Sequence, residues 1–258
     1  MLSSKKPAKN TIKHKVKTEP KKEDPVTTVT VPYKTLTTFL KAIEGCIEEA
    51  VLSIRDSELS VKTTDNANIY MVVAQCPCKT EVQDKSPAKI GISVKLLNKA
   101  LLHAKGCNVT MSISESKILL KYGRFSAQVS CVDINALRKE PNDPKMSLNN
   151  EFSLPGKYLD EICNMVSSSG KVRLLVENKV VTLRTEEGDL SVTEVVGTTD
   201  GKGEANSLYP ADYLKNIAKA VKGVDCTVRA GVDHPVHIFA EVEDCNFQFF
   251  LAPRIESE

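Results

Sequence analysis

Tryptophan is absent from this sequence, and aromatic residues make up only 5% of its 258 residues. Hydrophobic residues nevertheless reach 41%, so the expected core consists mainly of aliphatic side chains. Long apolar runs are also missing, and the basic N-terminal residues do not form a signal peptide. We therefore expect an intracellular protein without a membrane-spanning segment, long enough for two modest domains.

The common catalytic motifs are missing too. The sequence contains no G-x-x-x-x-G-K-[ST] phosphate loop, no G-x-S-x-G nucleophile turn and no H-E-x-x-H zinc motif. Gly201 and Gly203 stand in a predicted loop rather than at a strand-to-helix turn, so they make no dinucleotide-binding fingerprint. These patterns predict neither an enzyme activity nor a cofactor.

Eight cysteines are present, but their positions do not favour a disulfide framework. Cys46, Cys131, Cys163 and Cys226 fall within predicted helices or strands, where cysteine acts as a small buried hydrophobe. The sequence therefore indicates a reduced protein.

Cys76 and Cys78 form the closest pair of thiols. A zinc site needs two further ligands at suitable spacing, which the sequence does not offer, so no metal site is predicted. His234 and His237 flank a proline between two predicted strands and are interpreted as hairpin residues. An enzyme that uses Cys76 and Cys78 for metal or redox chemistry remains the catalytic alternative.

Charge is unevenly distributed along the chain. The formal net charge is +2, yet residues 1–25 alone hold eight lysines and three acids, which leaves the remainder mildly acidic. We expect 1–25 to be a disordered basic tail that aids solubility, touches DNA or directs nuclear import. Any nucleic-acid contact by the folded part must then come from a local basic stripe.

One repeated unit organises the rest of the sequence, and its clearest copy begins at 208–223. Leu214, Ile217 and Val221 recur at helical spacing and form one apolar face. Lys215, Lys219 and Lys222 form a neighbouring stripe, and two alternating strands follow. The predicted unit is therefore a helix with one buried face and one basic stripe, followed by a hairpin.

The unit occurs four times. The first copy opens with a strand that ends at Pro32, and the third copy opens with a strand that ends at Pro155. The second copy follows the first, and the fourth copy follows the third. The chain thus divides into an N-terminal domain (26–135), an interdomain linker (136–150) and a C-terminal domain (151–258). Helices are expected at 33–50, 93–105, 157–168 and 208–223.

Alternating residues predict the strands, and clusters of polar and turn residues predict the loops. The expected strands are 28–31, 51–55, 59–63, 69–75, 108–114, 117–121, 125–132, 172–177, 180–185, 189–195, 226–232, 236–242 and 246–251. Loops are expected at 76–88 and 197–206. A strand, helix and hairpin cannot bury an apolar face alone, so paired copies are expected to share a core.

Four short motifs resemble motifs of a known family, and each lies on the expected copy of the repeat in the expected order. They are LSVKTTD (59–65), YLKNI (213–217), DHPV (233–236) and LAPRIE (251–256). With the four repeats, they make the sequence similar to sliding clamps of the proliferating cell nuclear antigen (PCNA) type, the archaeal ones above all, over about Val26 to Glu256. The resemblance implies an α+β DNA clamp fold in which three subunits form a ring, with helices inside and sheets outside.

The implied function is that of a DNA polymerase processivity factor without chemistry of its own. Such a clamp encircles duplex DNA without regard to sequence and tethers replication and repair proteins. The implied phosphate contacts, otherwise simply solvated lysines, are Lys34, Lys41, Lys95, Lys99, Lys157, Lys215, Lys219 and Lys222. The implied partners are duplex DNA, DNA polymerase, a clamp loader, a ligase and a nuclease, and the implied location is with replicating DNA inside the cell.

The family also implies a pocket for short partner peptides and a contact between subunits. The pocket walls would be Asn68, Ile69, Met71, Leu137, Pro235, Phe250, Ala252, Pro253 and Ile255, although Ile69, Met71 and Phe250 also suit an ordinary sheet core. The subunit contact would join two edge strands through Arg124, Phe125, Ala127, Val129, Cys131, Leu190, Val192 and Glu194.

Some features depart from the family pattern. The basic tail is unusual, and the segment between Val195 and Leu208 is short, so one strand of the second half is expected to be missing or reduced. Phe250 replaces a common tyrosine, and Arg138 and Lys139 replace apolar residues of the linker. These departures keep open a clamp relative that works as a monomer or hetero-oligomer, such as a viral processivity factor or a checkpoint-type ring subunit.

Overall fold

The computed structural model describes residues 26–55, 57–81, 88–201 and 203–254. The predicted basic tail and the predicted pocket residue Ile255 lie outside these residues. The described part forms four α-helices: α1 (Tyr33–Glu44), α2 (Val94–Ala100), α3 (Gly156–Asn164) and α4 (Ala211–Val221). None of these helices has the length and apolar character needed to cross a membrane.

The strands of the first half are β1 (Thr27–Pro32), β2 (Glu49–Arg55), β3 (Glu58–Thr64), β4 (Tyr70–Pro77), β5 (Lys79–Glu81), β6 (Lys89–Ser93), β7 (Asn108–Ile113), β8 (Lys117–Tyr122) and β9 (Phe125–Ser130). Those of the second half are β10 (Asn150–Pro155), β11 (Lys171–Glu177), β12 (Val180–Glu187), β13 (Leu190–Thr198), β14 (Ala205–Pro210), β15 (Asp225–Ala230), β16 (Val236–Val242) and β17 (Cys245–Leu251). This mixture of sheets and helices confirms the predicted α+β class.

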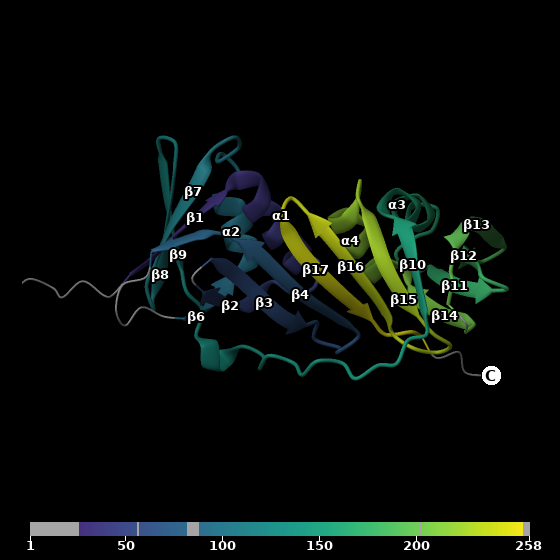
Figure 1. Cartoon of the computed structure of the whole chain (residues 1–258). Coiled ribbons are helices and arrows are strands. Elements are labelled where there is room, and N and C mark those ends of the chain that lie inside the picture. The colour runs from purple at the N-terminus through teal and green to yellow at the C-terminus, as the bar shows by residue number, and fades with distance from the viewer. Residues whose placement is uncertain (1–25, 56, 82–87, 202, 255–258) are drawn as a thin grey trace, which may run out of the picture.

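Three antiparallel sheets hold these strands. The central sheet has the order β10-β15-β16-β17-β4-β3-β2-β6, so strands of both halves share it. The halves meet where β17 pairs with β4, with Phe249 opposite Val72 and Phe247 opposite Ala74. A smaller sheet flanks it at each end of the molecule, β5-β1-β7-β8-β9 in the first half and β13-β12-β11-β14 in the second (Figure 1).

The helices pack side by side in the order α2, α1, α4, α3 and cover one face of the central sheet. Their apolar positions are buried as the helical spacing predicts; Leu36, Phe39 and Ile43 of α1 and Leu214 and Ile217 of α4 are examples. The burial of one apolar face in every helix confirms the predicted repeat.

Several helices are shorter than the sequence predicts. α1 ends at Glu44 rather than 50, because Gly45 follows it and residues from Glu49 onward already alternate between exposed and buried as β2. From Leu102 onward, backbone bonds to the third residue back replace helical bonds, so α2 does not reach 105.

The ends of the second-half helices differ from the prediction for similar reasons. α3 stops at Asn164 instead of 168, since a turn closed by Gly170 N–H and the Ser167 carbonyl follows. α4 begins at Ala211, because residues 208–210 complete β14 and pair with β11.

The two predicted loops also contain strand residues. β4 continues through Pro77, and Lys79–Glu81 forms β5, which pairs with β1. In the second half, β13 continues to Thr198 and β14 begins at Ala205. Both loops are shorter than predicted. β5, β13 and β14 lie at sheet edges, where polar strand residues resemble loop residues in sequence.

The second half has no equivalent of β5 among its described residues. β5 covers the outer side of β1, whereas β10, which holds the matching place before α3, pairs with β15 alone. The Thr199 hydroxyl donates a hydrogen bond of 2.8 Å to the Glu151 carbonyl of β10 instead. This agrees with the shortened segment noted in the sequence.

The linker crosses the central sheet on the face opposite the helices. It begins with the 3₁₀ turn η1 (Ile134–Ala136) and runs in an extended conformation to β10 (Figure 1). Lys62, whose neighbours Val61 and Thr63 point into the core, forms an ion pair of 2.7 Å with Asp143 of the linker. Asn150 is buried and belongs to β10 rather than to the linker.

Candidate functional site

The helical face carries most of the predicted DNA-contacting lysines at its surface. Seven of them are exposed: Lys34, Lys41, Lys95, Lys99, Lys157, Lys219 and Lys222. Only Lys215 is half-buried, and its ammonium donates to the Val166 carbonyl. All eight lie on the four helices or directly after them, so the structure gathers them on one layer.

Three of these lysines have acidic partners. Lys34 lies 2.7 Å from Glu243, Lys95 lies 2.9 Å from Glu48, and Lys222 lies 2.7 Å from Asp160. The hydrogen bonds to Glu48 and Asp160 raise the pKa of Lys95 and of Lys222, so both amines are fully charged at neutral pH. Because all three lysine side chains are largely exposed, each pair is weak and its carboxylate can be replaced by another anion.

Lys41 and Lys219 face each other across the contact between α1 and α4. They line a hollow of about 330 Å³ together with Glu44 and Asn216. The floor is fixed, because the Asn216 side-chain amide donates a 3.1 Å hydrogen bond to the Gly45 carbonyl. Neither lysine forms an ion pair with a described residue, so this seam offers two free ammonium groups from different halves of the chain.

A second contact at this seam joins the two halves. The Tyr213 hydroxyl of α4 donates a 2.7 Å hydrogen bond to Asp65, in the turn between β3 and β4. Burial acts to raise the pKa of Asp65, but the hydrogen bonds from Tyr70 N–H, Tyr213 and Ile69 N–H outweigh it and lower the pKa. The charged carboxylate therefore ties the start of α4 to the first half.

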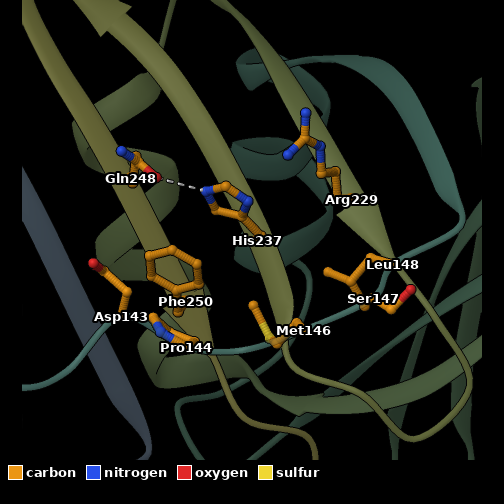
Figure 2. Close-up of a pocket in the computed structure, with 9 residues that line it drawn as sticks. All are labelled: Asp143, Pro144, Met146, Ser147, Leu148, Arg229, His237, Gln248 and Phe250. Carbon is orange, nitrogen blue, oxygen red and sulfur yellow. Dashed lines mark hydrogen bonds between the residues drawn. The ribbon is translucent and has the colours of Figure 1, made fainter.

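On the opposite face, the linker and the central sheet enclose a groove. Its volume is about 470 Å³ (Figure 2), and it is lined by Asp143, Pro144, Met146, Ser147, Leu148, Arg229, His237, Gln248 and Phe250. The His237 and Phe250 rings stack at 4.3 Å with an angle of 6° and form its floor. Apolar linker side chains thus lie opposite an aromatic floor, with polar groups at the rim.

One residue that lines the groove, His237, has a pKa that its surroundings lower. His237 Nε2 lies 3.1 Å from the Gln248 side-chain oxygen, and Arg229 beside it pairs with Glu151 at 2.6 Å. Burial lowers the pKa of His237 below its ordinary value. The ring is therefore neutral at pH 7 and stacks on Phe250 as an uncharged aromatic.

The predicted peptide pocket is only partly assembled around this groove. Phe250 lines it, and the 2.9 Å hydrogen bond from Ala252 N–H to the Ile69 carbonyl places the chain end beside Ile69. Pro235 precedes Val236, which pairs with Leu251 directly before Ala252 and Pro253.

Other predicted pocket residues lie further from Phe250 or are covered. Leu137 lines a separate hollow of about 490 Å³ beside the end of α1. Asn68 holds a hydrogen bond from Arg138, and Met71, although opposite Phe250 in register, is only 7% exposed. Ile255 lies outside the described residues.

The sequence did not single out most of the groove residues. Arg229, His237 and Gln248 alternate with buried neighbours on β15, β16 and β17, which marks them only as outward-facing. Met146 and Leu148 were isolated apolar residues in the linker. The groove could have been found in the sequence only by combining the outward-facing residues of three neighbouring strands with the apolar residues of the linker.

The two predicted interface strands lie at free sheet edges at opposite ends of the molecule (Figure 1). β9 pairs only with β8 and β13 only with β12. Phe125 at the start of β9 is 41% exposed, and Leu190 at the start of β13 is 49% exposed. Of the other predicted contact residues, Arg124 is exposed, Ala127, Cys131, Val192 and Glu194 are half-buried, and Val129 belongs to the core.

The cysteines are free thiols in protected surroundings. Burial raises the pKa of Cys46 and of Cys163 to about 12, so both stay protonated at neutral pH. Contact with Cys245, then burial, raises the pKa of Cys76. Within the described ranges, no three His, Cys, Asp or Glu side chains gather as a metal site would require.

Known proteins provide the comparison for this arrangement. No protein-family model matches the sequence. The DNA polymerase sliding clamp of Methanothrix thermoacetophila is 28% identical over 237 residues, which are 87% of this chain and 97% of that protein.

Solved structures share the fold. Archaeoglobus fulgidus PCNA, bound to the C-terminal region of FEN-1, has a TM-score of 0.80 at 23% identity, over 90% of this chain and 100% of that one. A chain of the PCNA2–PCNA3 complex from Sulfolobus tokodaii has a TM-score of 0.74 at 18% identity, over 89% and 100%. This nearly complete match makes the chain similar to DNA polymerase sliding clamps, and the chain shares the fold of PCNA.

Proposed function

We propose that this protein is a DNA polymerase processivity factor that encircles duplex DNA and tethers replication and repair proteins to it. The observation that carries this proposal is that the two faces of one sheet present different surfaces. Lysines cover the helical face, and a groove with an aromatic floor lies on the other. Such a protein acts as a scaffold and has no chemistry of its own.

The helical face suits DNA without regard to sequence. Lysine ammonium groups contact phosphates, and such contacts fix position and affinity without reading bases. Lys41 and Lys219 are the strongest candidates, because neither has an acidic partner among the described residues and both line the same hollow. Lys34, Lys95 and Lys222 would exchange their carboxylate partners for phosphates as the duplex enters.

Ring formation follows from the free edges. β9 of one subunit would pair with β13 of the next, and this contact would cover the exposed side chains of Phe125 and Leu190. Since the two edges differ, the contact is head-to-tail, and it closes into a ring when three copies complete a full rotation. We propose a homotrimer.

A clamp subunit that assembles with a different chain is the second candidate. The absent equivalent of β5 leaves β10 without an outer partner in the described part of the second half, which alters this half relative to the first. A PCNA2–PCNA3 complex exists in Sulfolobus tokodaii, so hetero-oligomers occur in the family.

The groove suits short partner peptides. An extended peptide with apolar anchors would place them between Met146 and the His237–Phe250 floor. We propose a polymerase, a flap nuclease, a ligase and a clamp loader as partners, and a location with the replicating DNA inside the cell.

Topology tests this function without a partner protein. The protein is incubated with linear duplex DNA, whose ends are then blocked, and with the same DNA as a closed circle. A ring threads onto the linear DNA only, stays after the ends are blocked, and leaves when an enzyme cuts the DNA. Equal retention on the closed circle and on open-ended linear DNA would count against an encircling clamp.

A further inference from the structure

We infer that Arg138 is a specificity-determining residue of the peptide groove, because it straps the linker across the first-half end of that groove. This inference rests on the proposed peptide-tethering function. It adds the end of the groove at which a partner peptide enters. The strap closes the groove over the turn between β3 and β4 and leaves it open beside Phe250.

The Arg138 guanidinium reaches four acceptors in that turn. It donates to the Asp65 carbonyl at 2.9 Å, to the Asn66 carbonyl at 2.8 Å and to the Asn68 side-chain oxygen at 2.7 Å. A longer bond of 3.3 Å reaches the Thr64 hydroxyl. A planar guanidinium with fixed donors suits this set of acceptors better than an ammonium does.

Two ion pairs continue the closure along the linker. Glu140 lies 3.0 Å from Lys89 of β6, and Asp143 lies 2.7 Å from Lys62 of β3. The Lys62 side chain is only 16% exposed, so the linker covers it closely. From residue 138 to residue 143, the linker is therefore held against strands of the first half.

Met71 is the apolar side chain that this closure would keep from a partner. It stands opposite Phe250 in the register of β4 and β17, and Phe250 faces the groove. Yet Met71 is 7% exposed and lies outside the main hydrophobic core cluster. An apolar side chain on the linker side of the sheet is thus kept from solvent at the strapped end.

The other end of the groove stays accessible. Between Pro144 and Leu148, the linker stands away from the sheet and leaves the hollow of about 470 Å³ above His237 and Phe250 (Figure 2). A partner's first apolar anchor therefore fits at Phe250, and a second anchor reaches Met71 only after Arg138 releases the turn. The strap selects against peptides that need both positions.

The test compares Arg138→Ala and Arg138→Lys with a matched control, Lys139→Ala. Lys139 is exposed and makes no ion pair or side-chain hydrogen bond with a described residue. The Lys139→Ala substitution removes one positive charge, as Arg138→Ala does. The probe is a fluorescent peptide of the FEN-1 C-terminal region, the segment bound to A. fulgidus PCNA. Fluorescence anisotropy gives its Kd, and hydrogen exchange reports opening of 137–143 in the full chain without peptide.

Loss of the strap raises the fraction of chains whose groove is open, so Arg138→Ala should lower the Kd about fivefold. Exchange in 137–143 should become faster, Arg138→Lys should fall between, and Lys139→Ala should match the wild type. Unchanged exchange in Arg138→Ala, or faster exchange with an equal or higher Kd, overturns the inference.

A peptide that binds none of the variants gives a distinct result. It would overturn the peptide-tethering function and with it the specificity role of Arg138. The exchange measurement would still decide whether Arg138 holds the linker, so the two failures are told apart.

Discussion

The two faces of the central sheet are built from different kinds of contact. On the helical face, each lysine is placed by the spacing within its own helix, even where its ionic partner comes from another segment, as Glu243 does for Lys34. On the linker face, the groove exists only because residues 143–148 lie over three strands that come about a hundred positions later. One face is thus a local product of the repeat, whereas the other depends on long-range packing.

This difference predicts that each face can be broken without the other. Changes in helix lysines should weaken DNA contact and leave the groove intact, and changes in the groove should spare DNA contact. The predictions below run from the largest expected effect to the smallest.

Reversing the charge at the seam between α1 and α4 should have the largest effect. Lys41→Glu with Lys219→Glu replaces two free cations by two acids, so duplex affinity should fall about a hundredfold at low salt. The plot of log affinity against log salt concentration should also become shallower by about two units. Lys117→Glu with Lys121→Glu, on the exposed side of β8, is the control and should change little.

The groove should respond to loss of its floor. Phe250→Ala removes the ring that stacks on His237, so affinity for the FEN-1 peptide should fall about tenfold. Calorimetric titration measures this, and Phe239→Ala, an exposed aromatic on β16, serves as control. Equal loss in both variants would mean that aromatic surface in general, rather than this floor, binds the peptide.

The contact that joins the halves should have a moderate effect on stability. Tyr213→Phe removes the hydroxyl that donates to Asp65, which should lower the free energy of unfolding by about 1 kcal/mol. Urea unfolding monitors this change. A variant as stable as the wild type would show that water replaces the lost hydroxyl without cost.

The smallest effect concerns pH. Burial lowers the pKa of His237 in the folded protein, so the unfolded chain binds the proton more readily and stability falls as the pH drops from about 6.5 through the folded pKa. Between pH 7.5 and pH 5.5, the wild type should lose more stability than His237→Gln. Parallel loss in both proteins would assign the pH dependence to other groups.

The sequence predicted the helical face well, because a helix shows its buried side through residues three and four apart. Leu214, Ile217 and Val221 are buried as expected, and Lys219 is exposed beside them. Helix ends were predicted less well, since Gly45 and the strand pattern after it compete for the same residues. β5 was missed because a three-residue strand at a sheet edge has too few residues to show alternation.

The groove could not be derived from periodicity. Met146 and Leu148 have no pattern in the linker, and the stack of His237 on Phe250 depends on the register of β16 and β17. Arg138 appeared only as a departure from the family pattern, and its role emerged from the turn that it contacts. Contacts between distant segments require the folded chain, whereas surface stripes on one helix do not.

Native mass tests the central claim most directly. Light scattering over a concentration series, with and without residues 1–25, would measure how many chains of 28.3 kDa associate. A ring built from β9 and β13 predicts the mass of three chains in both forms. The mass of a single chain at every concentration would contradict the self-assembling homotrimer and direct the search toward a different partner subunit.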